Sequence, residues 1–217
     1  MAGLSADTVR ANLEAVRAEI AATGRSPDEV EILAAVKYVD VDDLSALVDA
    51  GITLVGENRA QDLVAKAERW PGRFEWDFIG HLQSRKVKQI LPHVRLIQSM
   101  ASESALRQLE RHATPDTEVL VEVNLAGEAS KSGIAPDELD AFLERAAGIV
   151  RVTGLMTMPP FTEEAEASRP YFARLRELAH ERSLQRLSMG TTQDFPVAVQ
   201  EGATIVRIGT RLYAQGG

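Results

Sequence analysis

The segment Glu31-Ile32-Leu33-Ala34-Ala35-Val36-Lys37 is an apolar run that ends in a lysine, and an aspartate-rich turn at residues 38–43 follows it directly. Its apolar side chains are consecutive and do not alternate with polar ones. The same character recurs in Val119-Leu120-Val121 and in Thr204-Ile205-Val206. Strands of this kind are buried on both faces, so the sequence predicts a parallel sheet that helices cover.

Eight such strands are expected along the chain, with helical patterns between them. They are placed at Glu31–Val36, Ile52–Glu57, Glu75–Gly80, Leu96–Met100, Glu118–Asn124, Val150–Met158, Gln185–Gly190 and Ala203–Gly209. Eight alternations predict a single α/β domain, residues 1–217, folded as a (β/α)8 TIM-type barrel. An open doubly wound sheet is the alternative, but the Gly-x-Gly-x-x-Gly motif expected after its first strand is absent.

Several segments between the strands have helix start signals. Asp40 is expected to cap a helix that carries Leu44, Leu47 and Val48, and Ser102 is expected to cap the helix of Leu106 and Leu109. Ala135-Pro136-Asp137-Glu138 places proline and acidic residues in the expected first turn of a third helix.

The chain after the eighth expected strand is too short for a closing helix of ordinary length. An amphipathic segment precedes the first strand instead, with Val9, Leu13, Val16 and Ile20 on one face. We therefore expect an extra N-terminal helix to cover the gap beside strand eight.

The composition excludes several classes of protein. Lys and Arg number 24 against 32 Asp and Glu, so the net charge of −8 argues against sequence-independent nucleic-acid binding. With no cysteine, disulfides and thiolate chemistry are excluded, and the four scattered histidines predict no metal site. Without a signal-peptide pattern or a membrane-length apolar stretch, we expect a cytoplasmic protein with no membrane partner. No long exposed apolar stripe is evident, so we expect a monomer.

Lys37 is the first candidate for chemistry. A lysine where a buried strand meets a loop is expected to have its stem in apolar surroundings, and desolvation favours the neutral amine that forms a Schiff base with a carbonyl. The alternative is a lysine whose stem lies along the strand end while its amine is solvated.

Two loops are candidates for a phosphate site. In this fold phosphates often bind between the loops after strands seven and eight, which here read Ser188-Met189-Gly190-Thr191-Thr192 and Gly209-Thr210. Glycine lets backbone N–H groups approach an anion, and the hydroxyl residues add donors. Thr192 is also a candidate cap for a short helix that begins near Gln193. The alternative is ordinary turn chemistry.

Other polar residues fall near the same expected rim. Arg207 on strand eight either pairs with a core carboxylate or points into the barrel mouth. Asn58 either caps the expected helix 59–69 or contacts a ligand. His81 follows strand three with no acidic partner in view, so we do not expect catalysis by it, and Met156 is expected in the core.

A Schiff-base lysine beside a phosphate cradle predicts a ligand that has both an aldehyde and a phosphate. Pyridoxal 5′-phosphate (PLP) fits this description, and so does a phosphosugar.

The motifs of the chain resemble those of the pyridoxal phosphate homeostasis proteins, the YggS/PROSC family. The resemblance spans residues 8–213 and rests on a series of motifs in order: Ala35-Val36-Lys37, Gly56-Glu57-Asn58, Phe78-Ile79-Gly80-His81-Leu82-Gln83-Ser84, Val123-Asn124 with Lys131-Ser132-Gly133, Gly154-Leu155-Met156, Ser188-Met189-Gly190 and Val206-Arg207-Ile208-Gly209-Thr210. Two stretches depart from the usual pattern, Tyr38-Val39-Asp40 after the lysine and Thr191-Thr192-Gln193 after Gly190.

The resemblance implies a fold-type III PLP-binding barrel, similar to the N-terminal domain of alanine racemase, that holds PLP covalently. Lys37 would form the Schiff base, and Ser188, Gly190, Gly209 and Thr210 would hold the phosphate. Arg207 would face the pyridine nitrogen, and Asn58 would lie beside the ring. An arginine at that nitrogen weakens the ring as an electron sink, so the resemblance implies a carrier in PLP homeostasis, with PLP-dependent apo-enzymes as partners, and no catalytic residues.

Two other classes remain open from the residues. One is a Schiff-base enzyme of the same fold, either an amino-acid racemase or a phosphosugar aldolase. The other is a structural or interaction protein, which would leave the lysine and both phosphate loops unexplained.

Overall fold

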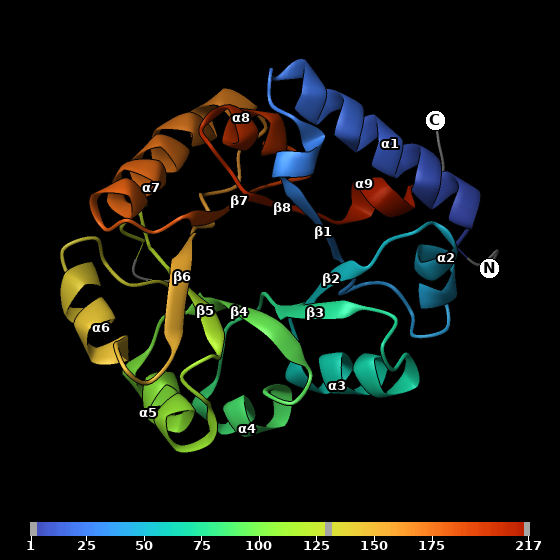
Figure 1. Cartoon of the computed structure of the whole chain (residues 1–217). Helices are drawn as coiled ribbons and strands as arrows, with labels where there is room; N and C mark the ends of the chain where they lie inside the picture. The colour runs from blue at the N-terminus through green and yellow to red at the C-terminus, as the bar shows by residue number, and fades with distance from the viewer. Residues whose placement is uncertain (1–3, 129–131, 215–217) are drawn as a thin grey trace.

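Eight parallel strands close into a barrel with helices around it (Figure 1). The computed structural model describes residues 4–128 and 132–214. Its strands are β1 (Glu31–Ala35), β2 (Leu54–Glu57), β3 (Glu75–Phe78), β4 (Val94–Met100), β5 (Glu118–Glu122), β6 (Arg151–Met156), β7 (Arg186–Thr191) and β8 (Ile205–Ile208). The predicted (β/α)8 barrel is confirmed, and the open doubly wound sheet is wrong.

The helices alternate with the strands. They are α1 (Ala6–Ala22), α2 (Leu44–Asp49), α3 (Ala60–Arg69), α4 (Val87–Ile90), α5 (Glu103–His112), α6 (Leu139–Ala146), α7 (Arg169–Glu181), α8 (Phe195–Gln200) and α9 (Thr210–Tyr213). Three short 3₁₀ helices join them, η1 (Pro27–Glu29), η2 (Ser84–Lys86) and η3 (Ala165–Ser168).

The barrel closes where β8 pairs with β1. The register of this pair places Leu33 beside Arg207 and Ala34 beside Ile208. Every strand therefore has a hydrogen-bonded neighbour on both sides, and the sheet has no free edge. All eight carboxyl ends consequently point to the same rim.

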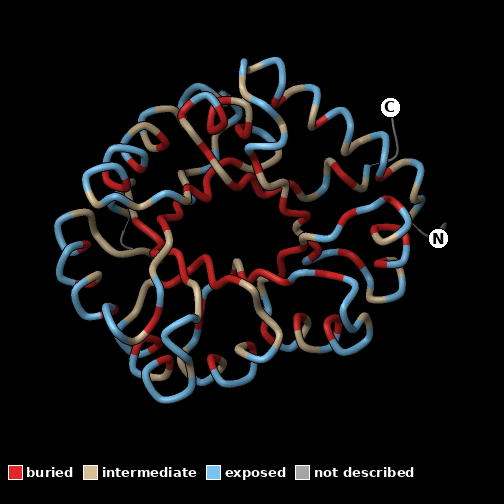
Figure 2. Tube along the Cα trace, in the orientation of Figure 1, coloured by how far each residue is buried: buried red, intermediate tan, exposed pale blue. Residues whose placement is uncertain are grey.

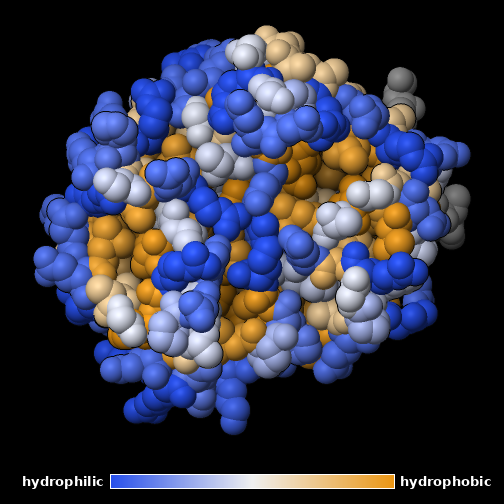
Figure 3. All heavy atoms as spheres, in the orientation of Figure 1, coloured by the Kyte–Doolittle hydropathy of each residue, from blue (hydrophilic) through white to orange (hydrophobic). Residues whose placement is uncertain are grey.

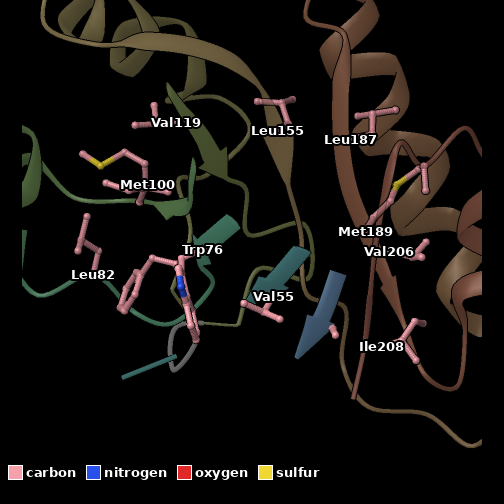
Figure 4. Packing of buried hydrophobic residues seen from close by; sticks show 14 of the residues in the cluster. Val55, Trp76, Leu82, Met100, Val119, Leu155, Leu187, Met189, Val206 and Ile208 are labelled. Carbon is pink, nitrogen blue, oxygen red and sulfur yellow. The ribbon is translucent and has the colours of Figure 1, made fainter. Parts of the chain in front are cut away.

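Two layers of apolar side chains fill the fold. Residues such as Val55, Leu155 and Val206 belong to the large cluster between the sheet and the helices (Figure 4). A smaller cluster fills the barrel itself, and its buried members are Leu33, Leu96, Leu120, Met156 and Ile205. The inner sides of the helices are buried and their outer sides are exposed (Figure 2). On the face seen in Figure 3, hydrophilic residues cover most of the rim, and hydrophobic residues show in the hollows between them.

The N-terminal helix covers the seam of the barrel, as the sequence predicts. Helix α1 packs against α2, α8 and α9. Its residues Val9, Val16 and Ile20 are fully buried, and Leu13 is half-buried. Helix α9 has only four residues, so α1 supplies the apolar face that a longer eighth helix would supply.

Two predicted helix starts are wrong. Asp40 is not the cap of α2, because this helix begins at Leu44 after a turn and its N-cap position is Asp43. Residues 136–138 also form a turn, and α6 begins after them at Leu139. Ser102 does cap α5, where its Oγ accepts a hydrogen bond from the Ala105 N–H at 3.2 Å.

Charged side chains meet at the amino end of the barrel. The Arg95 guanidinium donates to Glu31 and Asp77, and Arg186 donates to Glu31 at 2.8 Å and Glu118 at 3.0 Å. Burial alone would raise the pKa of Glu31, but the hydrogen bonds and charges of the two arginines lower it below its ordinary value. These ion pairs join strands β1, β3, β4, β5 and β7 at the end opposite the predicted site.

Replacing Ile20 by alanine tests whether α1 is part of the core. Ile20 is fully buried, so we expect Ile20→Ala to lower the free energy of unfolding by about 2–5 kcal/mol. Urea denaturation followed by circular dichroism measures this. The control is Glu14→Ala, an exposed position of the same helix, with an expected change within about 0.5 kcal/mol. Equal costs for the two variants would contradict the role given to α1.

Candidate functional site

A cavity of about 770 Å³ opens at the carboxyl ends of the strands. Its lining comes from the ends of β1, β2, β3, β5, β6, β7 and β8 and from the loops that follow them. Six of the seven residues predicted for the site line it: Lys37, Asn58, Gly190, Arg207, Gly209 and Thr210. Ser188 does not. His81 and Met156 also line the cavity, and Met156 is buried, as expected for a core residue.

Lys37 lies in a turn, two residues beyond the end of β1, and its side chain is exposed. The expected desolvation of this side chain is therefore wrong, because β1 ends at Ala35, one residue earlier than predicted, and Lys37 lies in the turn beyond it. The Lys37 Nζ lies 4.8 Å from the centroid of the Tyr38 ring, a cation–π distance. Lys37 is thus an exposed residue at the rim of the cavity.

A buried ion pair holds two backbone segments in place, the one before Lys37 and the one before Asn58. Lys66 Nζ on α3 donates to Glu57 Oε2 at 2.7 Å and to the carbonyl oxygen of Val36 at 2.7 Å. The other Glu57 oxygen accepts from the Asn58 N–H at 2.8 Å. Breaking a buried pair by removing one partner costs about 3–5 kcal/mol. The pair therefore fixes the residues that precede Lys37 and Asn58.

Asn58 is not the cap of α3. That helix begins at Ala60, its N-cap position is Arg59, and no side chain caps it. Among the described residues, the Asn58 side-chain amide has no hydrogen-bond partner, and it lines the cavity. The expectation that Asn58 caps this helix is therefore wrong, and the residue lines the cavity instead.

The two glycine-containing loops lie side by side at the cavity. The Gly209 N–H donates to Thr192 Oγ1 at 3.3 Å, which joins the loop after β8 to the loop after β7. Asp194 Oδ1 accepts from the Thr191 N–H at 2.7 Å and from its hydroxyl at 3.1 Å. The expected cap is wrong, because α8 begins at Phe195 and its N-cap position is Asp194.

Gly190 requires the absence of a side chain. Its φ is +89°, and a Cβ there would lie 2.5 Å from the Ala198 Cβ and 2.9 Å from the Phe195 Cα. The end of β7 can therefore pack against α8 only with glycine at this position.

Ser188 lies deeper in the barrel than the cavity wall. The residue is fully buried, and its Oγ donates to Gln98 Oε1 at 2.6 Å and accepts from Arg207 Nη1. The hydroxyl predicted to bind phosphate is thus part of a hydrogen-bond network inside the barrel.

Arg207 is buried and lines the cavity, and no carboxylate of the described residues forms an ion pair with it. Its Nη2 donates to the Thr157 carbonyl at 3.0 Å and to Met158 Sδ at 2.8 Å. Burial lowers the pKa of Arg207 to about 10, although the charges of Asp194 and Glu122 oppose this. Of the two expectations for Arg207, the ion pair with a core carboxylate is therefore wrong, and the residue lines the cavity at the mouth of the barrel.

Several lining residues were not predicted from the sequence. Glu122 is buried at the end of β5, and its Oε1 accepts from Ser132 Oγ at 2.7 Å. Three exposed large hydrophobic residues among those described, Tyr38, Met158 and Phe161, all lie on the cavity rim. Tyr38 follows β1, whereas Met158 and Phe161 follow β6, so only the fold brings these exposed residues together. Lys131, in the same motif as Ser132, lies outside the described residues.

The fold and the position of the cavity define the class of protein. A family model described as "Alanine racemase, N-terminal domain" matches residues 4–215. The barrel of alanine racemase from Corynebacterium glutamicum superposes with a TM-score of 0.72 at 13% identity, covering 98% of this chain and 62% of that one, which shows the shared fold alone.

Closer relatives narrow the class to a family. A pyridoxal phosphate homeostasis protein of Aquifex aeolicus is 38% identical over 94% of both chains, and one of Pseudomonas aeruginosa is 37% identical over 95% of both. PipY of Synechococcus elongatus, solved with PLP bound, superposes with a TM-score of 0.80 at 28% identity, covering 95% of this chain and all of that one. The chain belongs to the family of pyridoxal phosphate homeostasis proteins. In the part of the chain that the structure describes, no helix is long and apolar enough to cross a membrane.

Gly190→Ala tests the packing of the end of β7. The matched control is Gly202→Ala, because Gly202 has a similar φ of +95° but a Cβ there would meet nothing closer than 3.6 Å. Both variants carry the backbone cost of a positive φ, about 1–2 kcal/mol, and only Gly190→Ala adds overpacking of about 1–3 kcal/mol. Urea unfolding of both proteins measures the difference. No extra loss in Gly190→Ala would contradict the close approach of this strand end to α8.

Proposed function

We propose that this chain binds pyridoxal 5′-phosphate as a Schiff base on Lys37 and takes part in intracellular PLP homeostasis, in the cytoplasm and as a single domain. The observation that carries the proposal is the assembly of Lys37, Asn58, Arg207 and both glycine-containing loops around one cavity. A protein of full-length similarity, PipY, has been solved with PLP bound.

The residues of the cavity fit this cofactor. Its volume of about 770 Å³ falls in the range of small-molecule sites, which is about 300–1,000 Å³. Bound PLP supplies an aldehyde that condenses with a primary amine, and Lys37 presents such an amine at the rim. Lys37 is exposed, and the Val36 carbonyl directly before it accepts a hydrogen bond from Lys66. The backbone at Lys37 is therefore fixed while its side chain stays accessible.

The phosphate is assigned to the loops after β7 and β8. Gly190, Gly209 and Thr210 line the cavity together with Thr191 and Thr192. Thr210 begins α9. The Leu212 N–H donates to the Gly209 carbonyl at 2.9 Å, so among the described residues the N–H groups of Thr210 and Arg211 are the ones left to donate to an anion. The Ser188 hydroxyl donates to Gln98 and accepts from Arg207. We therefore assign Ser188 the role of holding Arg207 in place.

Arg207 is assigned to the ring nitrogen and Asn58 to the side of the ring. A guanidinium donates hydrogen bonds and accepts none, so an arginine at the pyridine nitrogen keeps that nitrogen unprotonated. The ring is then a weak electron sink, which opposes racemase or decarboxylase chemistry. We therefore assign the chain the role of a carrier of PLP, monomeric and with PLP-dependent apo-enzymes as its recipients.

Lys37→Ala tests the covalent attachment. We expect the variant to fold, because Lys37 is exposed, and to lose the visible absorption band that PLP gives with the wild-type protein. Borohydride reduction followed by peptide mapping should label Lys37 in the wild type. Lys88→Ala, an exposed lysine on α4, is the control and should keep both signals. A pyridoxyl label on another lysine of the wild type would refute the assignment.

Thr210→Val tests the phosphate site. Hydrogen bonds to charged groups contribute about 1.5–3 kcal/mol each, so we expect Thr210→Val to bind PLP about tenfold or more weakly. Binding of pyridoxal, which has no phosphate, should hardly change. Titrations of both ligands against both proteins, read from the visible band, decide this. An equal loss for the two ligands would mean that Thr210 shapes the loop and does not contact the phosphate.

A further inference from the structure

A line of buried polar side chains crosses the inside of the barrel. Arg207 on β8 is 5% exposed, and Ser188 on β7, Gln98 on β4 and Asp77 on β3 are fully buried. The surrounding interior is apolar. Burying polar groups there costs free energy unless each finds a hydrogen-bond partner, so this line needs a structural or functional reason.

The hydrogen bonds of this line all run in one direction. Arg207 Nη1 donates to Ser188 Oγ, and Ser188 Oγ donates to Gln98 Oε1 at 2.6 Å. Gln98 Nε2 then donates to Asp77 Oδ2 at 2.6 Å. Each neutral group turns its oxygen toward the cation and its hydrogen toward the anion, so the dipoles are aligned and the bonds strengthen one another.

Arg207 is buried without an adjacent carboxylate, and the line supplies one of its neutral acceptors. A buried charge normally has a partner, but the three groups that accept from Arg207 are the Ser188 hydroxyl, the Thr157 carbonyl and the Met158 sulfur, all neutral. The charges that favour the Arg207 cation without touching it are those of Asp194 and Glu122. Asp77, at the far end of the line, forms an ion pair with Arg95 at 2.8 Å. Burial raises the pKa of Asp77, while hydrogen bonds from Arg95 and Gln98 oppose that rise.

We infer that Gln98 is a positioning residue of the site: with Ser188 it fixes the guanidinium of Arg207 in the cavity wall. A carboxylate in direct contact would neutralise the guanidinium and take its donors. The line through Ser188 and Gln98 orients Arg207 and leaves it able to donate to an acceptor atom of a ligand ring. The inference rests on the proposed function for the nature of that ligand.

A double-mutant cycle on PLP binding tests the inference. Gln98→Leu is made alone and combined with Arg207→Met, and dissociation constants are read from the visible band. Gln98→Leu should weaken PLP binding about tenfold, equivalent to about 1.4 kcal/mol. In the Arg207→Met background the same change should weaken it less than about twofold, because Gln98 acts through Arg207. Equal losses in the two backgrounds, or no loss at all, would overturn the inference.

Thr153→Val is the matched control for removing a buried polar group. The Thr153 hydroxyl on β6 is buried and has no hydrogen-bond partner among the described residues. Its loss should leave the dissociation constant unchanged. A tenfold loss in this control as well would show that any change of barrel polarity disturbs the site, and would overturn a specific role for Gln98.

The cofactor-free proteins supply an independent measurement. Urea unfolding of the same four proteins should show coupling between Gln98 and Arg207 of about fivefold in the unfolding equilibrium constant, or about 1 kcal/mol. Additive effects would overturn the inference whatever the ligand. Failure of the wild type to bind PLP would refute the proposed function alone, and the unfolding cycle would still decide on Gln98. Should Gln98→Leu not fold, Ser188→Ala removes the same link and replaces it in both cycles.

Discussion

Parallel pairing between β8 and β1 is the constraint on which the rest of the structure depends. It joins strands that lie far apart in the sequence, and it leaves no strand with an unpaired edge. Once the sheet is closed, the carboxyl ends of all its strands form one ring. Lys37, in the turn after the first strand, and Arg207, on the last strand, then line one cavity because the barrel is closed, although they lie far apart in the sequence.

The two ends of the barrel carry different kinds of polar chemistry. At the amino end, Arg95 and Arg186 are paired with carboxylates, so charge there is balanced by direct contact. At the carboxyl end, Arg207 meets only neutral acceptors, and Lys37 meets an aromatic ring. The ion pairs of the amino end therefore join strands of the barrel. At the carboxyl end, Arg207 and Lys37 are two cations without a carboxylate of the described residues in contact, at the end of the barrel where ligands bind in this fold. Asp77 and Gln98 connect the two ends through the interior.

The sequence predicted the elements well and the depth of individual residues less well. Consecutive apolar residues identified the strands, and the face of Val9, Val16 and Ile20 identified the helix that covers the seam. Strand ends, however, depend on where neighbouring strands stop pairing. Because β1 ends at Ala35, Lys37 lies in an exposed turn and not at a buried strand end.

The same limit explains Ser188 and Asn58. Ser188 and Gly190 share one motif and one face of β7, but two residues along a strand are about 6.6 Å apart, which separates the interior from the cavity wall. No pattern in the sequence specifies that depth. Asn58 stands two residues before α3, and only the structure distinguishes a cap from a lining residue. Glu122 was not predicted, because the apolar run Val119-Leu120-Val121 identified its strand and no pattern marked the glutamate that follows.

The ring of strand ends has a thermodynamic consequence. The cavity is lined by residues from both ends of the chain, so its full set of contacts exists only in the closed barrel and in no open fragment of it. A ligand of this cavity binds the native state and not the unfolded chain. By mass action, a free ligand at about one hundred times its dissociation constant adds about 2.7 kcal/mol to the stability of such a fold. The concentration of the small molecule thereby sets part of the free energy of unfolding.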